Sequence, residues 1–245
     1  MSKEFKSFKS KIPYLRDVYL AYLIDGAERT ERYGYPIIPP EFCCGKVPGD
    51  VAQWNQRSQV KDPAHTAMSF YCKDEWFQPV LSNPQAYVEK LRPYECVIGM
   101  DCSPFDNMPA WIADHQIGMN LSVTYYFGKC GLKVIPNVRV ANTPGSGESL
   151  LACPKHVLIA IGTNGFTREI ANRDVFMAQV SKVVEALEPA GIIVYGPASY
   201  DIFLTPRFMG VPIYQFDSFM QRRNASRRKK KEGGDGDEEQ KPPLL

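Results

Sequence analysis

The sequence lacks a long hydrophobic run. None of its apolar stretches approaches the ~20 residues that a membrane-spanning helix requires. The first residues, Met1 to Lys6, carry lysines but have no signal-peptide apolar segment behind them. We therefore expect a cytoplasmic protein that is neither secreted nor inserted into a membrane.

Metal and cofactor motifs are also missing. The three histidines, His65, His115 and His156, are far apart, and the adjacent Cys43 and Cys44 lack the spacing of a zinc site. No glycine-rich segment has the spacing of a phosphate-binding loop, and no GxGxxG motif follows the first strong strand. These absences argue against zinc and against a dinucleotide cofactor, and they leave the cofactor unknown.

Paired cysteine motifs are absent as well. The seven cysteines are odd in number, scattered, and mostly placed in apolar runs. This pattern is typical of reduced core thiols rather than of a disulfide framework. It agrees with the expected cytoplasmic location.

The sequence does contain five short apolar runs, rich in β-branched residues, that each stop at a small polar cluster. Helix-like segments separate them, such as the one that Pro109 can open and the one that Asn172 can cap. This alternation predicts buried parallel strands in an α/β fold. The runs are residues 96–100, 133–136, 157–161, 192–194 and 211–216.

Two weaker candidates, residues 35–39 and 68–72, bring the predicted strands to seven. A mostly parallel set of seven strands suits an incomplete TIM-like barrel, with an open doubly wound sheet as the alternative. Residues 15–32 show helical spacing of apolar positions, whereas residues 42–66 lack periodicity and predict a long connection of unknown role. We expect a single α/β domain over residues 1–220.

At the C-terminus a basic block precedes an acidic one. Residues 1–220 carry a net charge of −1, so the basicity of the chain is local. The polar, charge-blocked composition predicts a disordered tail over residues 221–245. The basic block could bind nucleic acid or an acidic partner, or it could serve solubility alone. It consists of Arg222, Arg223, Arg227, Arg228, Lys229, Lys230 and Lys231.

Polar residues that follow the strands supply the candidate site, because ligands in parallel α/β folds bind at the carboxyl ends of strands. Asp101 and Ser103 follow one strand, and Asn137 and Arg139 follow the next, each pair with the spacing of one strand face. The guanidinium of Arg139 suits a phosphate or carboxylate. Asp101 could be a general base, a magnesium ligand, or only the counter-ion of Arg139. Asp101, Ser103 and Arg139 are the catalytic candidates, and Asn137 is a ligand-binding candidate.

Three later strand ends extend this predicted site. Gly162, Thr163 and Asn164 could present backbone N–H groups to an anion at the start of a helix, or the glycine could merely make a tight turn. Tyr195 and Asp217 end the next two strands and are further ligand-binding candidates. Apart from magnesium on Asp101, the sequence predicts no metal ligand.

Several ordered motifs resemble those of a known family. The most specific are Asn137-Val-Arg139 and Gly162-Thr-Asn-Gly165, and the similarity extends over about residues 15–218. The chain resembles the family called domain of unknown function 4417, whose members occur in bacteria and in phage or other mobile elements. The family has no assigned reaction, so the resemblance implies a context and candidate positions but no chemistry. This chain has Asn164 where the family pattern has a histidine, and its helix after Arg139 is shortened.

The sequence leaves more than one function open. The first is a phage- or mobile-element-type protein whose strand-end crevice binds, or binds and processes, a nucleotide or nucleic acid. The alternative is a non-enzymatic interaction protein that binds nucleic acid or an acidic partner through its basic tail, and a small-molecule hydrolase or lyase is a third. A strand-end pocket with perturbed carboxylates would favour an enzyme, whereas a shallow edge on which Asp101 and Arg139 are fully paired would favour the interaction protein.

Overall fold

The computed structural model describes residues 17, 19–102, 108–138, 144–163, 170–199 and 201–232. Strands and helices alternate along this part of the chain, with short 3-10 helices between them. The strands are β1 (Asp50–Gln53), β2 (Thr66–Ser69), β3 (Cys96–Ile98), β4 (Val134–Ile135), β5 (Leu158–Gly162), β6 (Gly191–Tyr195) and β7 (Ile213–Phe216). The α-helices are α1 (Asp74–Ser82), α2 (Val88–Leu91), α3 (Ala110–Lys129), α4 (Pro144–Leu151), α5 (Ile170–Leu187), α6 (Leu204–Phe208) and α7 (Phe219–Glu232).

The seven strands form two parallel sheets, with the orders β1-β2-β3-β4 and β5-β6-β7. Just beyond β4, a parallel bridge between Asn137 and Ala160 joins the two sheets. There the Val138 N–H donates to the Ala160 carbonyl at 2.9 Å, and the Ala160 N–H donates to the Pro136 carbonyl at 2.8 Å. Strand order therefore follows chain order throughout, and the prediction of an α/β fold with parallel strands is confirmed.

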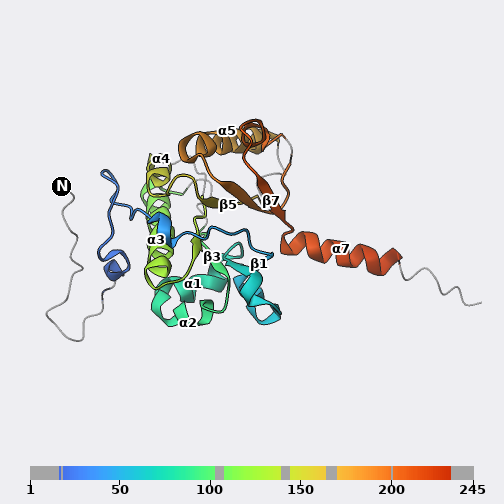
Figure 1. The fold of residues 1–245 in the computed structure, drawn as a ribbon, viewed down its shortest axis with the longest axis horizontal. Coiled ribbons are helices and arrows are strands. Elements are labelled where there is room, and N and C mark those ends of the chain that lie inside the picture. Colours follow the sequence, from blue (N-terminus) through green and yellow to red (C-terminus); the bar gives the residue numbers. More distant parts are fainter. Residues whose placement is uncertain are drawn as a thin grey trace, which may run out of the picture.

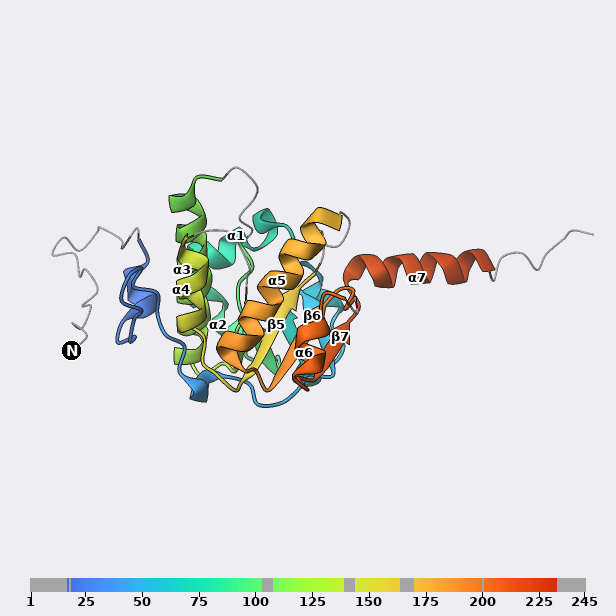
Figure 2. The same ribbon diagram turned by 90° about the horizontal axis from the view of Figure 1, so that it is seen from above.

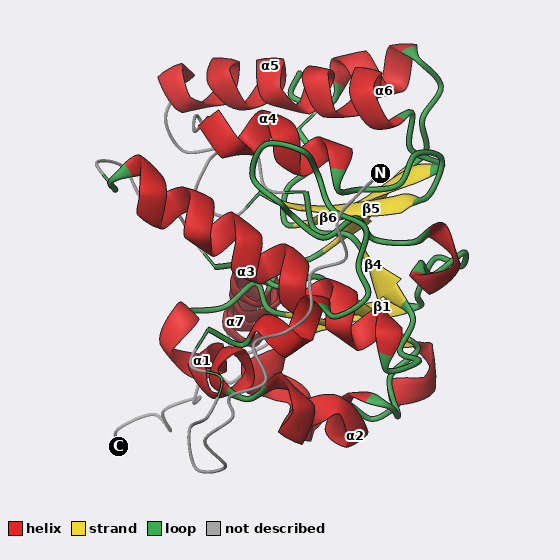
Figure 3. Ribbon diagram, turned by 90° about the vertical axis from the view of Figure 1, so that its left-hand side faces the viewer, coloured by secondary structure: helices red, strands yellow, loops and turns green. Residues whose placement is uncertain are grey.

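Side chains from every strand meet in one inner apolar cluster. Because successive side chains on a strand point to opposite faces, the alternate residues pack outward against the helices. The described strands form two parallel sheets and no closed barrel. Figure 3 shows the strands between α5 on one side and α2 on the other. The strand residues of the inner cluster include Val51, Ala67, Ile98, Ile135, Ala160, Ile193 and, partly buried, Phe216.

Helices surround the strands on three sides, with α5 on one side, α3 and α4 on a second, and α1 and α2 on a third (Figure 1). Helix α5 buries the apolar stripe that its spacing predicts, including Phe176, Val180 and Val184. Helix α3 follows Pro109, as expected, and the chain turns after it at Gly131, whose φ is 84°. The long amphipathic elements thus cover the outer face of the strands.

Helix α7 projects away from the body, as two perpendicular views show (Figures 1 and 2). Its first turn is hydrogen-bonded to the body, through Phe219 to Tyr195 of β6 and through Arg222 to Asp50 of β1. The expected disordered tail is therefore wrong for residues 221–232, which are helical. Residues 233–245 lie outside the described residues.

Two of the sequence predictions for the N-terminal third differ from the structure. Residues 35–39 form only an isolated bridge at Pro36, and the additional strand is β1, inside the segment that was expected to be a long connection. In the described part of residues 15–32, a single turn of 3-10 helix, η1 (Ala21–Ile24), replaces the expected α-helix. The reason is local, since Leu20 has a φ of 52° and the Asp17 carboxylate accepts hydrogen bonds from the N–H groups of Tyr19 and Tyr22.

None of the described helices is both long enough and apolar enough to cross a bilayer.

Candidate functional site

Asn137, just after β4, joins the carboxyl ends of three neighbouring strands. Its Nδ2 donates to the Met100 carbonyl and to Oδ1 of Asp101, both at 2.9 Å. Its Oδ1 accepts a hydrogen bond from the Tyr71 hydroxyl at 2.9 Å. Asp101 is 9% exposed, so this contact lies largely out of solvent. The structure thus brings Asp101 and Asn137 together, as their positions in the sequence predicted.

Tyr195, at the end of β6, continues the same edge. Its ring stacks on Tyr71 with the centroids 5.2 Å apart and an interplanar angle of 11°. Gly162 makes this stack possible, because a Cβ at that position would lie 2.7 Å from the Tyr71 ring. The Thr163 N–H donates to the Tyr195 carbonyl at 3.1 Å. Gly162, Thr163 and Tyr195 are therefore neighbours at the carboxyl edge, but the Thr163 N–H that was predicted to bind an anion is bonded to Tyr195.

The hydroxyl of Tyr195 also meets the start of α7. It accepts a hydrogen bond from the Phe219 N–H at 2.9 Å. Burial raises the pKa of Tyr195 to about 12, although this hydrogen bond and the nearby Arg222 act in the opposite direction. Burial thus favours the protonated form of the phenol.

Gln53, at the end of β1, completes the set by donating from Nε2 to the Tyr71 carbonyl. We call the five side chains of Gln53, Tyr71, Asp101, Asn137 and Tyr195 the strand-end network. It contains one carboxylate, two phenols and two amides, but no cationic side chain. These groups can form hydrogen bonds with a polar ligand. On its own the network has no positive charge that could bind a phosphate.

Asp217, another predicted site residue, lies between β7 and α7. Asp217 contributes its backbone carbonyl, which accepts a hydrogen bond from Nε of Arg222 at 3.0 Å. Ser103, Arg139 and Asn164 lie outside the described residues. Their predicted roles therefore remain predictions. Among the described residues, no group of three histidine, cysteine or acidic side chains is placed to hold a metal ion.

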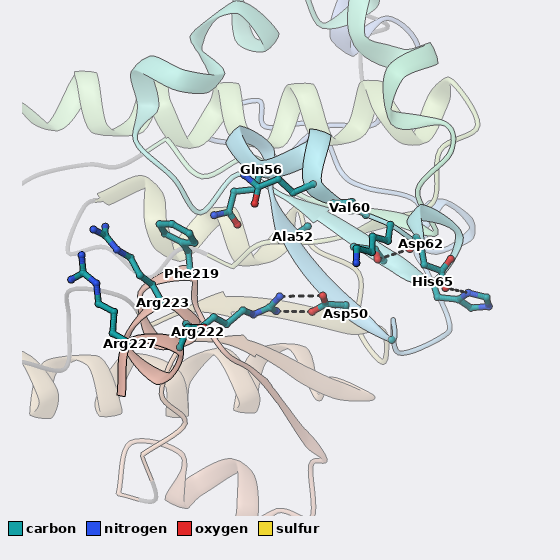
Figure 4. A pocket seen from close by; sticks show the side chains of 15 residues that line it. Asp50, Ala52, Gln56, Val60, Asp62, His65, Phe219, Arg222, Arg223 and Arg227 are labelled. Carbon is teal, nitrogen blue, oxygen red and sulfur yellow. Dashed lines mark hydrogen bonds and ion pairs between the residues drawn. The ribbon is translucent and has the colours of Figure 1, made fainter. Parts of the chain in front are cut away.

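A separate groove of about 800 Å³ lies between α7 and the segment that contains β1 and the 3-10 helix η3 (Trp54–Gln59) (Figure 4). Helix α7 contributes one face, because its lining residues recur at intervals of three and four. These residues are Phe219, Arg222, Arg223, Ser226 and Arg227. The opposite wall includes the polar residues Gln56, Gln59, Lys61, Asp62 and His65, together with Ala52 and Val60. We call this space the α7 groove.

Arg222 fastens α7 to the body across the groove. Its guanidinium contacts the Asp50 carboxylate through two hydrogen bonds of 2.6 and 3.1 Å, and it also donates to the Val51 carbonyl at 3.2 Å. The hydrogen bond to Asp50 is the main cause that raises the pKa of Arg222. Figure 4 shows this side chain reaching from α7 to β1. Its charge is therefore already engaged by a carboxylate.

The other cationic side chains of the α7 groove have fewer ion-pair contacts than Arg222 among the described residues. Asp62 pairs with His65 at 2.8 Å on the wall opposite α7. Lys61, Arg223 and Arg227 are exposed and line the groove, and none of them forms an ion pair with a described residue. The groove therefore presents a positive surface to a ligand, with no carboxylate assigned to these three side chains.

Sequence reasoning missed Tyr71, Gln53 and Phe219. Tyr71 was placed inside a strand, although β2 ends at Ser69 and leaves Tyr71 at the carboxyl edge. Gln53 belongs to a strand that was not predicted. The sequence does contain a signal for Phe219, because Phe219, Arg223 and Arg227 are four residues apart and would share one face of a helix.

Comparisons with known proteins add a family and one relative. A family model described as domain of unknown function (DUF4417) matches residues 30–211. The Gene 1 protein of Mycobacterium phage D29 is 22% identical over 171 residues, which are 69% of this chain and 63% of the phage protein. The match thus spans less than two thirds of that relative. No solved structure shows a significant match. The family match contains the whole strand-end network and ends before β7 and α7.

Proposed function

We propose that this protein, which belongs to the DUF4417 family, binds nucleic acid through its phosphate backbone, with the α7 groove as the contact surface. The observation that carries the proposal is the placement of Arg223 and Arg227, two exposed arginines one helical turn apart that have no ion-pair partner among the described residues. Each guanidinium can donate two parallel hydrogen bonds to a phosphate.

The charge distribution supports this assignment. Residues 1–220 have a net charge of −1, so long-range attraction between the body and a polyanion is weak. The basic block of the C-terminus lies on α7, where the side chains of Arg222, Arg223, Arg227 and Arg228 are exposed. Binding by such a surface depends on counterion release and does not require a base sequence.

The similarity to a phage protein supports a phage- or mobile-element-type origin. The arginines of α7 lie outside the residues that the family model matches. The proposed binding is therefore a property of this chain, and nothing in it requires the other family members to share it.

Salt-titrated binding to a random-sequence DNA duplex tests the proposal. The double variant Arg223→Gln/Arg227→Gln should weaken binding and reduce the slope of log K against log salt by up to ~1.8, because each phosphate contact contributes about 0.9. The control is Lys90→Gln/Lys182→Gln, which removes the same charge from exposed positions on α2 and α5 and should leave the slope nearly unchanged. Absence of binding by the unaltered chain at low salt would refute the proposal.

A second candidate is a ligand-binding crevice at the strand-end network, acting on a nucleotide. The observation in its favour is the nearly buried Asp101 carboxylate held by Asn137 at the carboxyl edge. Phosphate recognition there depends on Arg139, and Asp101 could bind magnesium. Thermal-shift screening of nucleotides with and without magnesium tests this candidate, and stabilisation should be smaller for Arg139→Lys than for the unaltered chain. Equal stabilisation of both proteins would argue against a role for Arg139.

A further inference from the structure

The α7 groove contains an aromatic ring beside its cations. Phe219 begins α7, lines the groove and is 36% exposed. Arg223 follows one helical turn later on the same face, and Arg227 one turn after that. Figure 4 shows Phe219 and Arg223 extending from the same side of α7. An exposed ring and two arginines thus follow one another along a single helix face.

The position of Phe219 is fixed from both sides. Its backbone N–H donates to the Tyr195 hydroxyl at 2.9 Å. The preceding Ser218 is buried, and its N–H donates to Oε1 of Gln221 at 2.9 Å. Arg222, three residues later, holds the same turn to Asp50. The ring therefore extends from an anchored turn, and this lowers the entropic cost of ordering the site when a base stacks on the ring.

The size of the groove limits what it can hold. About 800 Å³ falls in the range of roughly 300–1,000 Å³ that is typical of sites for one small ligand. The bases of a duplex are stacked on one another inside the helix, so they cannot reach Phe219 unless they are unpaired. An unpaired nucleotide has a free face for the ring and carries a phosphate for the arginines.

We propose that the α7 groove binds single-stranded nucleic acid, with one base stacked on Phe219 and the adjoining phosphates at Arg223 and Arg227. This inference rests on the proposed function and adds the strandedness of its ligand. Gln56 and Gln59 on the opposite wall can donate to and accept from base edges, and Lys61 offers a further cation. The combination of stacking and backbone contacts gives a preference for unpaired strands with little dependence on sequence.

The test compares fluorescently labelled oligothymidylate with a DNA duplex of equal length, using the full chain. Phe219→Leu keeps an apolar side chain but removes the aromatic face, and it should weaken single-strand binding roughly fivefold to a hundredfold. It should leave duplex binding and both salt slopes unchanged, since it removes no charge. Met220→Leu, an exposed position on α7 that does not line the groove, is the matched control. Circular dichroism and melting temperature establish that both variants are folded.

An oligonucleotide with abasic positions provides a second readout, in which the change is made in the ligand. The unaltered chain should bind it as weakly as Phe219→Leu binds the intact strand, and the two losses should not add, because both remove the same stack. An equal effect of Phe219→Leu on single strand and duplex, or no effect on either, would overturn the inference while leaving backbone binding intact. Failure of the unaltered chain to bind either nucleic acid would instead overturn the proposed function.

Discussion

At the scale of single residues, Asn137 uses its amide to connect three strand ends. Its Nδ2 donates hydrogen bonds to Met100 and Asp101, and its Oδ1 accepts one from Tyr71. The orientation of the amide follows from these partners, since two acceptors face the nitrogen and one donor faces the oxygen. A side chain of this kind stabilises the fold and at the same time fixes the carboxylate beside it.

Replacement of Asn137 tests this structural role. Asn137→Ala removes the acceptor of the Tyr71 hydroxyl and the side-chain donor to the Met100 carbonyl, so we expect a loss of ~1–3 kcal/mol in the free energy of unfolding. Urea denaturation measures it. Gln78→Ala, which removes an exposed hydrogen bond to Ser82, should change stability by no more than ~0.5 kcal/mol. If both variants unfold like the unaltered chain, the strand-end network does not contribute to stability.

Two glycines provide a matched pair of substitutions. At Gly162 a new Cβ would lie 2.7 Å from the Tyr71 ring, so Gly162→Ala must displace the stack on Tyr195 and should cost ~1–3 kcal/mol. At Gly147, within α4, a Cβ meets nothing within 4 Å, so Gly147→Ala should stabilise the protein by ~0.4–1 kcal/mol. Thermal denaturation measures both changes, and the same sign for the two would contradict the steric argument.

At the scale of elements, the sequence predicts the strands best where burial is greatest. The runs that contain β5 and β6 are almost uniformly apolar, and the structure buries nearly every one of their residues. Strand β1 has only Val51 and Ala52 as apolar residues, and it is held in place by parallel pairing with β2, which no local pattern reveals. The charged composition of α7 predicted disorder. The turn that contains Phe219 is instead held by contacts with residues distant in sequence, Tyr195 and Asp50.

Glu148 in α4 ties a distant loop to its helix. Its Oε1 accepts hydrogen bonds from the N–H groups of Arg32 and Tyr33 at 2.9 and 2.7 Å. Burial acts to raise the pKa of Glu148, but hydrogen bonds from Thr30, Tyr33 and Arg32 outweigh it, and the pKa lies below its usual value of 4.5. The carboxylate thus binds its proton less readily in the folded chain than in the unfolded one.

This difference predicts how stability depends on pH. The contribution of Glu148 is fully present above pH 4.5, the pKa of an unperturbed glutamate, and is lost as pH falls through the lower folded pKa. The melting temperature of Glu148→Gln should therefore lie below that of the unaltered chain at neutral pH, and the gap should narrow in acid. Parallel melting curves from pH 7 to pH 3 measure the gap. A gap that stays constant with pH would contradict a role for the ionised group.

At the scale of the whole molecule, two sheets share one core. Hydrogen bonds near Asn137 and Ala160 join them, and the inner cluster takes side chains from both. The carboxyl ends of β1, β2, β3, β4 and β6 meet in the strand-end network, and the Tyr195 hydroxyl connects this edge to the start of α7. The sequence could predict that strand ends converge, because parallel strands require it. It could not predict the Tyr71 stack or the Arg222 contact with Asp50, since both depend on how the sheets curve.

A shared core predicts that the chain unfolds in one cooperative transition. Trp54, Trp76 and Trp111 all precede β4, and Trp54 is 3% exposed, so tryptophan fluorescence reports on the first sheet. Hydrogen exchange at residues 158–162 and 191–195 reports on the second. Ile193→Val, which removes one buried methyl group from β6, should lower the free energy of unfolding by ~0.5–1.5 kcal/mol in both measurements. The fluorescence midpoint should shift although no tryptophan lies in the altered sheet. A shift seen only by hydrogen exchange would show that the two sheets unfold independently.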